Sequence, residues 1–323
     1  MTLPRPLLTL ACSTLTLSAL LASCGSPQTG AQPGGVQASP DAVVSGNRPE
    51  VSDLAVDPYA KISALQPQAT ESYTISLNFA PGSASSVVNA MNAAASRWQG
   101  VVTQGLPDAT VNIAANTCGS NPAFSGTVDD LLVFTGSKNI DGPGGILAQS
   151  GPCSVRSASG LTLYSTLIFD SSDLAQFSSQ LTDIAVHELG HSLGIGSLWS
   201  RFRLVNRVNT NNPTYSGANG VREYRAAGGT LSSVPVENQG GSGTRGAHWR
   251  ETTFQTELMT GFLNGGVPNP LSRISVGSLQ DMGYAVNYAA ADAYRVPGAA
   301  AQGLDGLDLA GREQVIEPRF RVD

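Results

Sequence analysis

Residues 187–197 read His-Glu-Leu-Gly-His-Ser-Leu-Gly-Ile-Gly-Ser and contain the pattern H-E-x-x-H. Positions i and i+4 of a helix lie on one face, so His187 and His191 can direct imidazole nitrogens at a single ion. Glu188 is the next residue around the helix and can reach a water bound to that ion. The pattern therefore predicts two zinc ligands and one general base.

The third ligand is missing from this segment. A catalytic zinc ion usually has three protein ligands and one water. The extended pattern H-E-x-x-H-x-x-G-x-x-H would place the third ligand at position 197, but Ser197 offers only a neutral hydroxyl. The chain has three histidines, and only His248 lies outside the motif. We therefore predict His248 as the third ligand, and the alternative is a histidine with a structural role.

Met259 follows His248 within the sequence Glu-Leu-Met-Thr-Gly, residues 257–261. A methionine in a tight turn beneath the metal is the second signature of the metzincin class of zinc peptidases. Taken alone, Met259 would be interpreted as an ordinary buried methionine. Together with the helix motif and His248, it predicts a Met-turn.

The combination of H-E-L-G-H-x-x-G, a long insertion, His248-Trp249 and Glu-Leu-Met-Thr resembles the leishmanolysin family, over about residues 70–290. These are metzincin zinc endopeptidases whose third histidine follows an insertion. The resemblance implies one catalytic Zn²⁺ and a polypeptide substrate, cleaved when Glu188 assists the attack of zinc-bound water. The chain has no cysteine in residues 25–68, so a latency mechanism based on a pro-segment thiolate has no residue to use.

The order of elements before the motif predicts an α/β or α+β sheet, and the resemblance favours an α+β fold. Alternation and apolar runs predict strands at 72–79, 111–114, 130–135 and 161–169, and helices at 83–99 and around the motif. We expect a metzincin-like mixed, twisted sheet with the active-site helix beneath it in an N-terminal subdomain, residues 69–196. The C-terminal subdomain, residues 197–290, is expected to be irregular, with a short helix around 218–226 and one closing helix within 270–284.

A short strand is predicted at Ile146, Leu147, Ala148 and Gln149, between glycines and Pro152. Strand addition at a sheet edge is a common way to hold a peptide. In the family that the chain resembles, the matching strand lines the cleft and pairs with substrate. The alternative is a plain surface strand.

The four cysteines form two pairs in the sequence. Cys118 and Cys153 are the two body cysteines, and in an exported chain we expect them to form a disulfide. The alternative is two free or metal-binding thiols.

Residues 1–24 have a positive start, an apolar run and the ending Leu-Ala-Ser-Cys-Gly, which resembles a bacterial lipoprotein signal with Cys24 as the lipid-modified residue. The alternatives are an ordinary secretory signal cut before Cys24 and an uncleaved membrane helix. Residues 25–68 are predicted to be a flexible tether or pro-segment because they are rich in Gly, Pro, Ser and Gln. Residues 291–323 are interpreted as a tail without chemistry.

Charged residues make up 13% of the chain, which suits an exported protein. The net charge of -6 and the absence of a basic run exclude nucleic acid as an expected partner. We expect a monomer that contacts the membrane through the lipid on Cys24. The alternatives to a peptidase are a non-catalytic, lipid-anchored surface binding protein and a zinc amidase acting on a small or cell-wall substrate.

Overall fold

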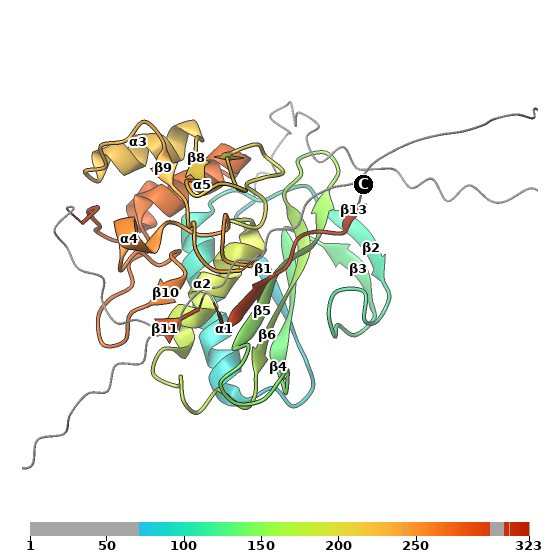
Figure 1. Ribbon diagram of the computed structural model, residues 1–323. Coiled ribbons are helices and arrows are strands. Elements are labelled where there is room, and N and C mark those ends of the chain that lie inside the picture. Colours follow the sequence, from blue (N-terminus) through green and yellow to red (C-terminus); the bar gives the residue numbers. More distant parts are fainter. Residues whose placement is uncertain (1–70, 242, 298–306, 310, 323) are drawn as a thin grey trace, which may run out of the picture. The chain divides into compact units, whose positions relative to one another are not determined.

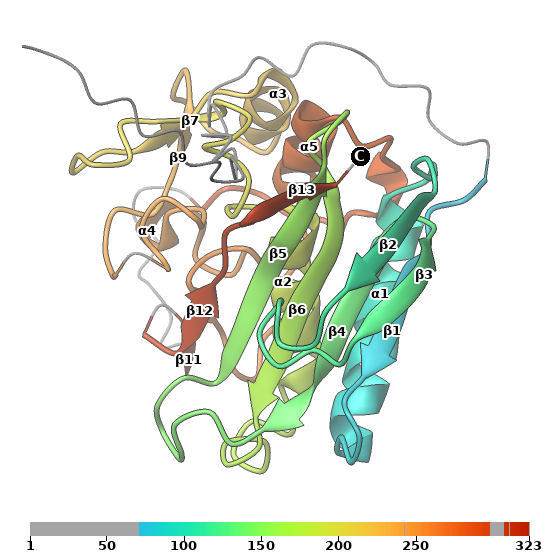
Figure 2. The same ribbon diagram turned by 90° about the vertical axis from the view of Figure 1, so that its right-hand side faces the viewer.

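The computed structural model describes residues 71–241, 243–297, 307–309 and 311–322. A mixed sheet has the strand order β1-β4-β6-β5-β12, and β13 also pairs with β5 (Figures 1 and 2). Strands β1, β4 and β6 are parallel, β5 is antiparallel to β6, and β12 and β13 run parallel to β5. The strands are β1 (Ile75–Phe79), β4 (Leu131–Lys138), β5 (Ala148–Arg156), β6 (Thr162–Asp170), β12 (Glu313–Val315) and β13 (Phe320–Val322).

The central strands are apolar on both faces because both faces of the sheet are covered. In β4, Leu131 and Val133 belong to the core on the helical side, whereas Leu132 and Phe134 belong to a second apolar cluster. Successive side chains of a strand point to opposite faces, so a continuous apolar run marks a strand buried on both sides. The strands predicted at 130–135 and 161–169 are confirmed on this basis as β4 and β6.

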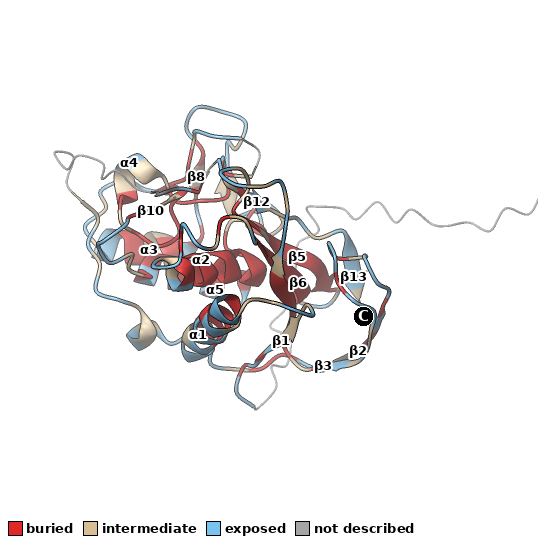
Figure 3. Ribbon diagram, turned by 90° about the horizontal axis from the view of Figure 1, so that it is seen from below, coloured by how far each residue is buried: buried red, intermediate tan, exposed pale blue. Residues whose placement is uncertain are grey.

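Two helices cover one face of the sheet, α1 (Ser85–Val101) and α2 (Leu181–Leu193). The indole Nε1 of Trp98 in α1 donates a hydrogen bond to the carbonyl oxygen of Val186 in α2, at 2.8 Å, so the two helices are fixed to each other. Figure 3 shows α2 and the neighbouring strands as the buried centre of the protein. The helix that carries the motif is therefore packed under the sheet, as predicted.

A hairpin covers part of the other face. It consists of β2 (Ala109–Ile113) and β3 (Phe124–Val128), and the disulfide between Cys118 and Cys153 joins its connecting loop to β5. The predicted disulfide is therefore present. Strand β3 was not predicted, because Ser125, Gly126 and Thr127 interrupt the apolar pattern that marks a strand.

The chain after α2 forms smaller elements, as expected for an irregular C-terminal part. They are β7 (Val205–Asn206), β8 (Thr214–Tyr215), β9 (Val234–Pro235), β10 (Phe262–Leu263), β11 (Leu307–Asp308), α3 (Ala218–Ala226), α4 (Glu251–Phe254), α5 (Arg273–Met282) and the 3₁₀ helix η1 (Tyr288–Ala290). Helix α3 is present where a short helix was expected, and α5 is the predicted closing helix. The rings of Trp199 and Trp249 pack with centroids 4.4 Å apart, and both side chains belong to the same hydrophobic core as α1 and α2.

The predicted start of the first helix needs a small correction. Helix α1 begins at Ser85 rather than 83, and the Ser83 hydroxyl donates to the Ala80 carbonyl. The N-terminal boundary of α2 is Gln180, and neither helix has a side-chain cap. Because α1 and α2 are both held by packing of an apolar face, neither depends on a serine cap for its position.

Several predictions lie outside the described residues: the signal peptide 1–24, lipidation of Cys24 and the tether or pro-segment 25–68. Within the described ranges, the structure contains no helix with the length and apolar character needed to cross a membrane.

Asp170, at the end of β6, organises the loop that leads to β5. Its fully buried carboxylate accepts backbone N–H bonds from Ile140, Asp141 and Gly142, at 3.0 to 3.2 Å, and from Ser172 at 2.7 Å. Burial alone would raise the pKa of Asp170, but these donors outweigh it and lower the pKa to about 2.

Replacement of this carboxylate, Asp170→Asn, should destabilise the protein by about 1–3 kcal/mol at pH 7, because buried N–H groups lose a charged acceptor. The folded pKa lies below the unfolded value of about 3.9, so the carboxylate stabilises above pH 4 and this contribution disappears as pH falls towards 2. Urea unfolding at pH 7, 4 and 2.5 should therefore show a shrinking difference from wild type. Asp108→Asn, at an exposed site, should change little, and a difference for Asp170→Asn that is constant with pH would contradict the assignment.

Candidate metal centre

Helix α2 delivers the first two predicted ligands and the predicted base. His187 and His191 are fully buried, and Glu188 is 1% exposed. The helix ends at Gly194, whose φ of 119° only glycine adopts readily, and whose N–H still bonds back to the carbonyl oxygens of Gly190 and His191. The motif is thus helical to its end, as its spacing predicted.

His248 joins these two histidines from the far side of the insertion. Its Nε2 atom lies 2.9 Å from Nε2 of His191 and 3.3 Å from Nε2 of His187, and the two helix histidines are 3.0 Å apart at the same atoms. The structure therefore brings together the three residues that the sequence analysis selected as ligands.

Each imidazole is oriented through its other nitrogen. Nδ1 of His187 lies 2.7 Å from the carbonyl oxygen of Leu258, Nδ1 of His191 lies 2.8 Å from that of Ile195, and Nδ1 of His248 lies 3.2 Å from that of Thr244. A backbone carbonyl can only accept, so each Nδ1 carries the proton. In the neutral rings, all three Nε2 lone pairs then point at one another.

This donor set fits a zinc ion. Three lone pairs at this separation repel one another unless a cation lies between them, and neutral imidazole nitrogens are preferred zinc ligands. A tetrahedral ion with Zn–N distances of about 2.0–2.1 Å needs nitrogens about 3.3 Å apart. Burial, and then the neighbouring imidazoles, lower the pKa of His191 well below its usual value, which favours its neutral, metal-binding form.

Glu188 lies beside the three imidazoles, and only one of its two carboxylate oxygens accepts a hydrogen bond. The hydroxyl of Ser150, in β5, donates to its Oε2 at 2.5 Å, whereas Oε1 is buried and has no hydrogen-bond partner. Burial, and then the charge of Glu313, raise the pKa of Glu188 to about 7. A buried polar atom without a partner is costly, so Oε1 marks a position where a polar group such as a water belongs. No sequence pattern pointed to Ser150.

Ser197 does not approach the metal centre as a ligand; its hydroxyl donates to the carbonyl oxygen of His191, at 2.6 Å. The chain then leaves for the long insertion and returns at Ala247. At Gly196, with φ of 74°, a Cβ atom would overlap the backbone of Ala247. The two ends of the insertion are therefore in contact, and this contact positions His248.

We expect Gly196→Ala to destabilise the protein by more than about 2 kcal/mol, because strain at positive φ adds to the overlap with Ala247. Gly82→Ala is a matched control, since Gly82 has φ of 77° but open space around it. That variant should be destabilised only by the strain at positive φ, by about 1–2 kcal/mol. Thermal unfolding of both variants measures the difference, and equal losses would show that the Ala247 contact is unimportant.

The predicted Met-turn lies against α2. A Cβ atom on Gly190 would lie 2.8 Å from the sulfur of Met259, so the turn packs on the helix between the two histidines. The buried carboxylate of Glu257 accepts from the Met259 N–H, at 2.6 Å, and from the hydroxyls of Ser272 and Ser275, both at 2.6 Å. Glu257 thereby ties the turn to α5, a role that its sequence position did not reveal.

The predicted edge strand needs a correction. Strand β5 covers Ala148–Arg156, so Ile146 and Leu147 precede it. Its outer edge is also not open, because β12 and β13 of the tail pair with it. The flanking glycines and Pro152 had suggested a short strand, but the ladder to β6 continues through a register shift after Pro152.

The tail also brings a fourth side chain to the imidazoles. A carboxylate oxygen of Glu313 lies 2.7 Å from Nε2 of His248 and 3.1 Å from Nε2 of His187, and its side chain is fully buried. Among the described residues, these four side chains form a group able to hold one ion. The sequence analysis assigned no chemistry to the tail, because a lone carboxylate without ligand spacing gave no signal, but the structure places its Glu313 beside the imidazoles.

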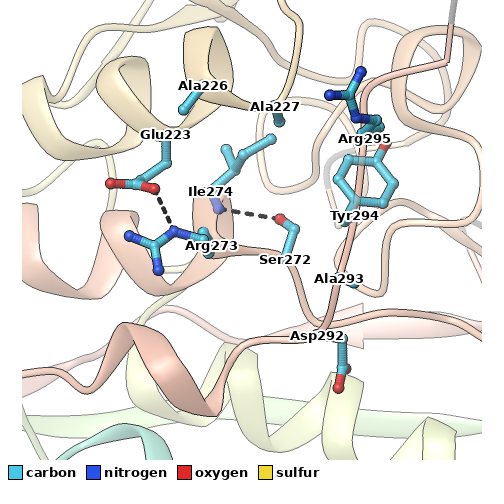
Figure 4. Close-up of a pocket in the computed structure, with 10 residues that line it drawn as sticks. All are labelled: Glu223, Ala226, Ala227, Ser272, Arg273, Ile274, Asp292, Ala293, Tyr294 and Arg295. Atoms are coloured by element: carbon cyan, nitrogen blue, oxygen red, sulfur yellow. Dashed lines mark hydrogen bonds and ion pairs between the residues drawn. The ribbon is translucent and has the colours of Figure 1, made fainter.

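A separate cavity of about 460 Å³ lies beside α3 and α5 (Figure 4). Its lining includes Glu223 and Arg273, whose carboxylate and guanidinium pair at 2.6 Å. None of the ten lining residues belongs to the histidine group. This cavity is therefore not part of the candidate metal centre.

The mixed sheet, the helix with two convergent histidines, the third histidine and the methionine turn define a metzincin-like zinc peptidase fold. Comparison with protein families agrees: the model described as Leishmanolysin matches residues 107–303, more than half of the chain. The chain belongs to the leishmanolysin family.

Similarity to individual proteins is more distant. The chain is 27% identical over 171 residues to leishmanolysin of Leishmania tropica, which covers 50% of this chain and 25% of that protein. It is 28% identical over 171 residues to leishmanolysin of Leishmania major, covering 50% of this chain and 27% of that protein. The aligned part thus spans about a quarter of the length of these relatives.

Proposed function

We propose that this protein is a zinc-dependent endopeptidase that hydrolyses peptide bonds of proteins outside the cytoplasm. The observation that carries the proposal is the convergence of three histidine Nε2 atoms, within 3.3 Å of one another, beside the buried carboxylate of Glu188. Membership of the leishmanolysin family supports the same activity.

Zinc held by His187, His191 and His248 would polarise a scissile carbonyl and make a bound water more acidic. Glu188 takes up the proton of the attacking water at its unpartnered Oε1 and passes it to the leaving amine. The Ser150 hydroxyl holds the other oxygen, so the carboxylate keeps its orientation during both transfers. Leu258, Ile195 and Thr244 keep the three Nε2 atoms aimed at the ion.

The proposed location is supported by the disulfide between Cys118 and Cys153, because disulfides persist in oxidising compartments. The signal-like residues 1–24, with lipid attachment at Cys24, extend the proposal to a cell-envelope lipoprotein. A polypeptide substrate is supported by β5, whose outer edge accepts an extended chain in this structure.

Casein digestion by the zinc-loaded protein, with and without a chelator, tests the activity. We expect cleavage that stops when zinc is removed and returns when zinc is restored. Cleavage that is insensitive to the chelator would contradict the proposal. The absence of cleavage in both wild type and Glu313→Ala would also contradict the proposal.

The non-catalytic alternative, a lipid-anchored binding protein, is not favoured. A protein that only binds has no use for a buried carboxylate with an unpartnered oxygen, and such a group is costly to keep. Glu188 and the three histidines are instead arranged as a working peptidase would need them.

A further inference from the structure

The last described residues of the chain follow the outer edge of β5. Strand β11 first pairs with β10, just after the Met-turn, and the N–H of Leu309 donates to the carbonyl oxygen of Gly261 at 2.9 Å. Strand β12 then pairs with the start of β5, and β13 pairs with its end. Figure 2 shows β12 and β13 beside the two ends of β5.

This tail uses the backbone groups that an extended substrate would need. The N–H of Leu147 donates to the carbonyl oxygen of Arg312 at 2.5 Å, and the N–H of Ile316 donates to that of Ser150 at 2.6 Å. Farther along, the N–H of Arg319 donates to the carbonyl oxygen of Cys153 at 3.1 Å. A peptide cannot add to this edge while the tail occupies it.

The tail is close to the rest of the protein at two glycines. Gly151 has no side chain where the backbone of Ile316 passes, and a Cβ atom there would overlap that backbone. A Cβ atom on Gly243 would make ordinary van der Waals contact with the carbonyl oxygen of Glu313, at 3.5 Å. The loop that precedes His248 therefore lies next to the tail.

Glu313 lies where its carboxylate would take the position that a catalytic zinc site must keep open. Its carboxylate contacts Nε2 of His248 and His187, so it would complete four protein ligands. Closed four-ligand sites are structural, whereas catalytic sites keep one position for water or substrate. A structural site, however, gives no reason for the adjacent Glu188 with its unpartnered buried oxygen. The group at the ligands is also a side-chain carboxylate, which offers no peptide bond for cleavage.

We propose that residues 311–322 are an autoinhibitory segment, in which Glu313 closes the metal site and β12 and β13 block the substrate edge until the segment is displaced. This inference rests on the zinc peptidase function proposed above. The segment pairs with β5 through two strands of three residues each, so it can leave without removing a central strand of the sheet.

The test measures access to zinc independently of turnover. Binding of acetohydroxamate, a small zinc ligand, is measured by calorimetry on zinc-loaded wild type, Glu313→Ala and Ile316→Pro. If the protein with a displaced tail makes up about 10% or less of wild type, both variants should bind acetohydroxamate about 10-fold tighter or better. In these variants the probe no longer has to displace the tail. Ile316→Pro keeps every side chain at the metal, but it removes the N–H that bonds to Ser150, replaces the Ile316 side chain and fixes the backbone φ.

Glu317→Ala is the matched control, because Glu317 is an exposed glutamate of the same segment. It should bind the probe as wild type does. Unchanged affinity in both Glu313→Ala and Ile316→Pro would overturn the proposal. Loss of zinc from Glu313→Ala, measured by metal content, would overturn it too, since Glu313 would then be a structural ligand. Tighter probe binding without casein cleavage in any variant would support the closed site while counting against the peptidase function.

Discussion

Glu188→Gln should leave zinc bound and reduce peptide hydrolysis by about 10²–10⁴-fold, the usual contribution of general acid–base catalysis. The substitution keeps the shape of the side chain and its hydrogen bond with Ser150, but it removes the proton acceptor beside the three imidazoles. Metal content and kcat, measured on the same preparation, separate this effect from loss of the ion.

Asp183→Asn is the matched control for that variant. Asp183 lies in the first turn of the same helix and interacts with Asn269 rather than with the metal centre. It should retain both zinc and turnover. If Glu188→Gln retained turnover within tenfold of wild type, the proton transfers would have to be assigned to another group.

The sequence predicted most directly those site residues whose relative positions are set within one short segment of the chain. His187, Glu188 and His191 lie within one helical turn and a half, so their spacing fixes how they face one another once the segment is helical. His248 was found differently, by counting the histidines that remained. Its position depends on contacts such as that between Gly196 and Ala247, which join residues about fifty positions apart and leave no periodic signal.

Ser150 and Glu313 were missed because nothing in their neighbourhood distinguishes them. Each reaches the site through strand pairing, Ser150 along β5 and Glu313 through the register of β12 on β5. Register is set by turn geometry and by packing of whole strands, so a single polar residue in a strand reveals neither its face nor its neighbour. The fold shows the same limit: the apolar runs of β4 and β6 were predicted, but the small and polar residues of β3 were not.

His248→Ala should abolish tight zinc binding and, with it, the stabilisation that zinc gives to the folded chain. Wild type at free zinc 100 times its dissociation constant gains about 2.7 kcal/mol from binding. If loss of one ligand weakens binding about 100-fold, the variant gains only about 0.4 kcal/mol at the same zinc concentration. Thermal unfolding with increasing zinc should therefore raise the melting temperature of wild type much more than that of the variant.

Arg245→Ala provides the comparison for this variant. Arg245 lies three residues before His248 in the same loop, and its exposed guanidinium bonds to the carbonyl oxygen of Asn238 at 2.9 and 3.0 Å. Its loss should leave the zinc response intact, because it does not touch the imidazoles. An equal zinc response in His248→Ala and wild type would remove His248 from the ligand set. The ion would then have to be held by the two helix histidines and Glu313, the remaining members of the buried group.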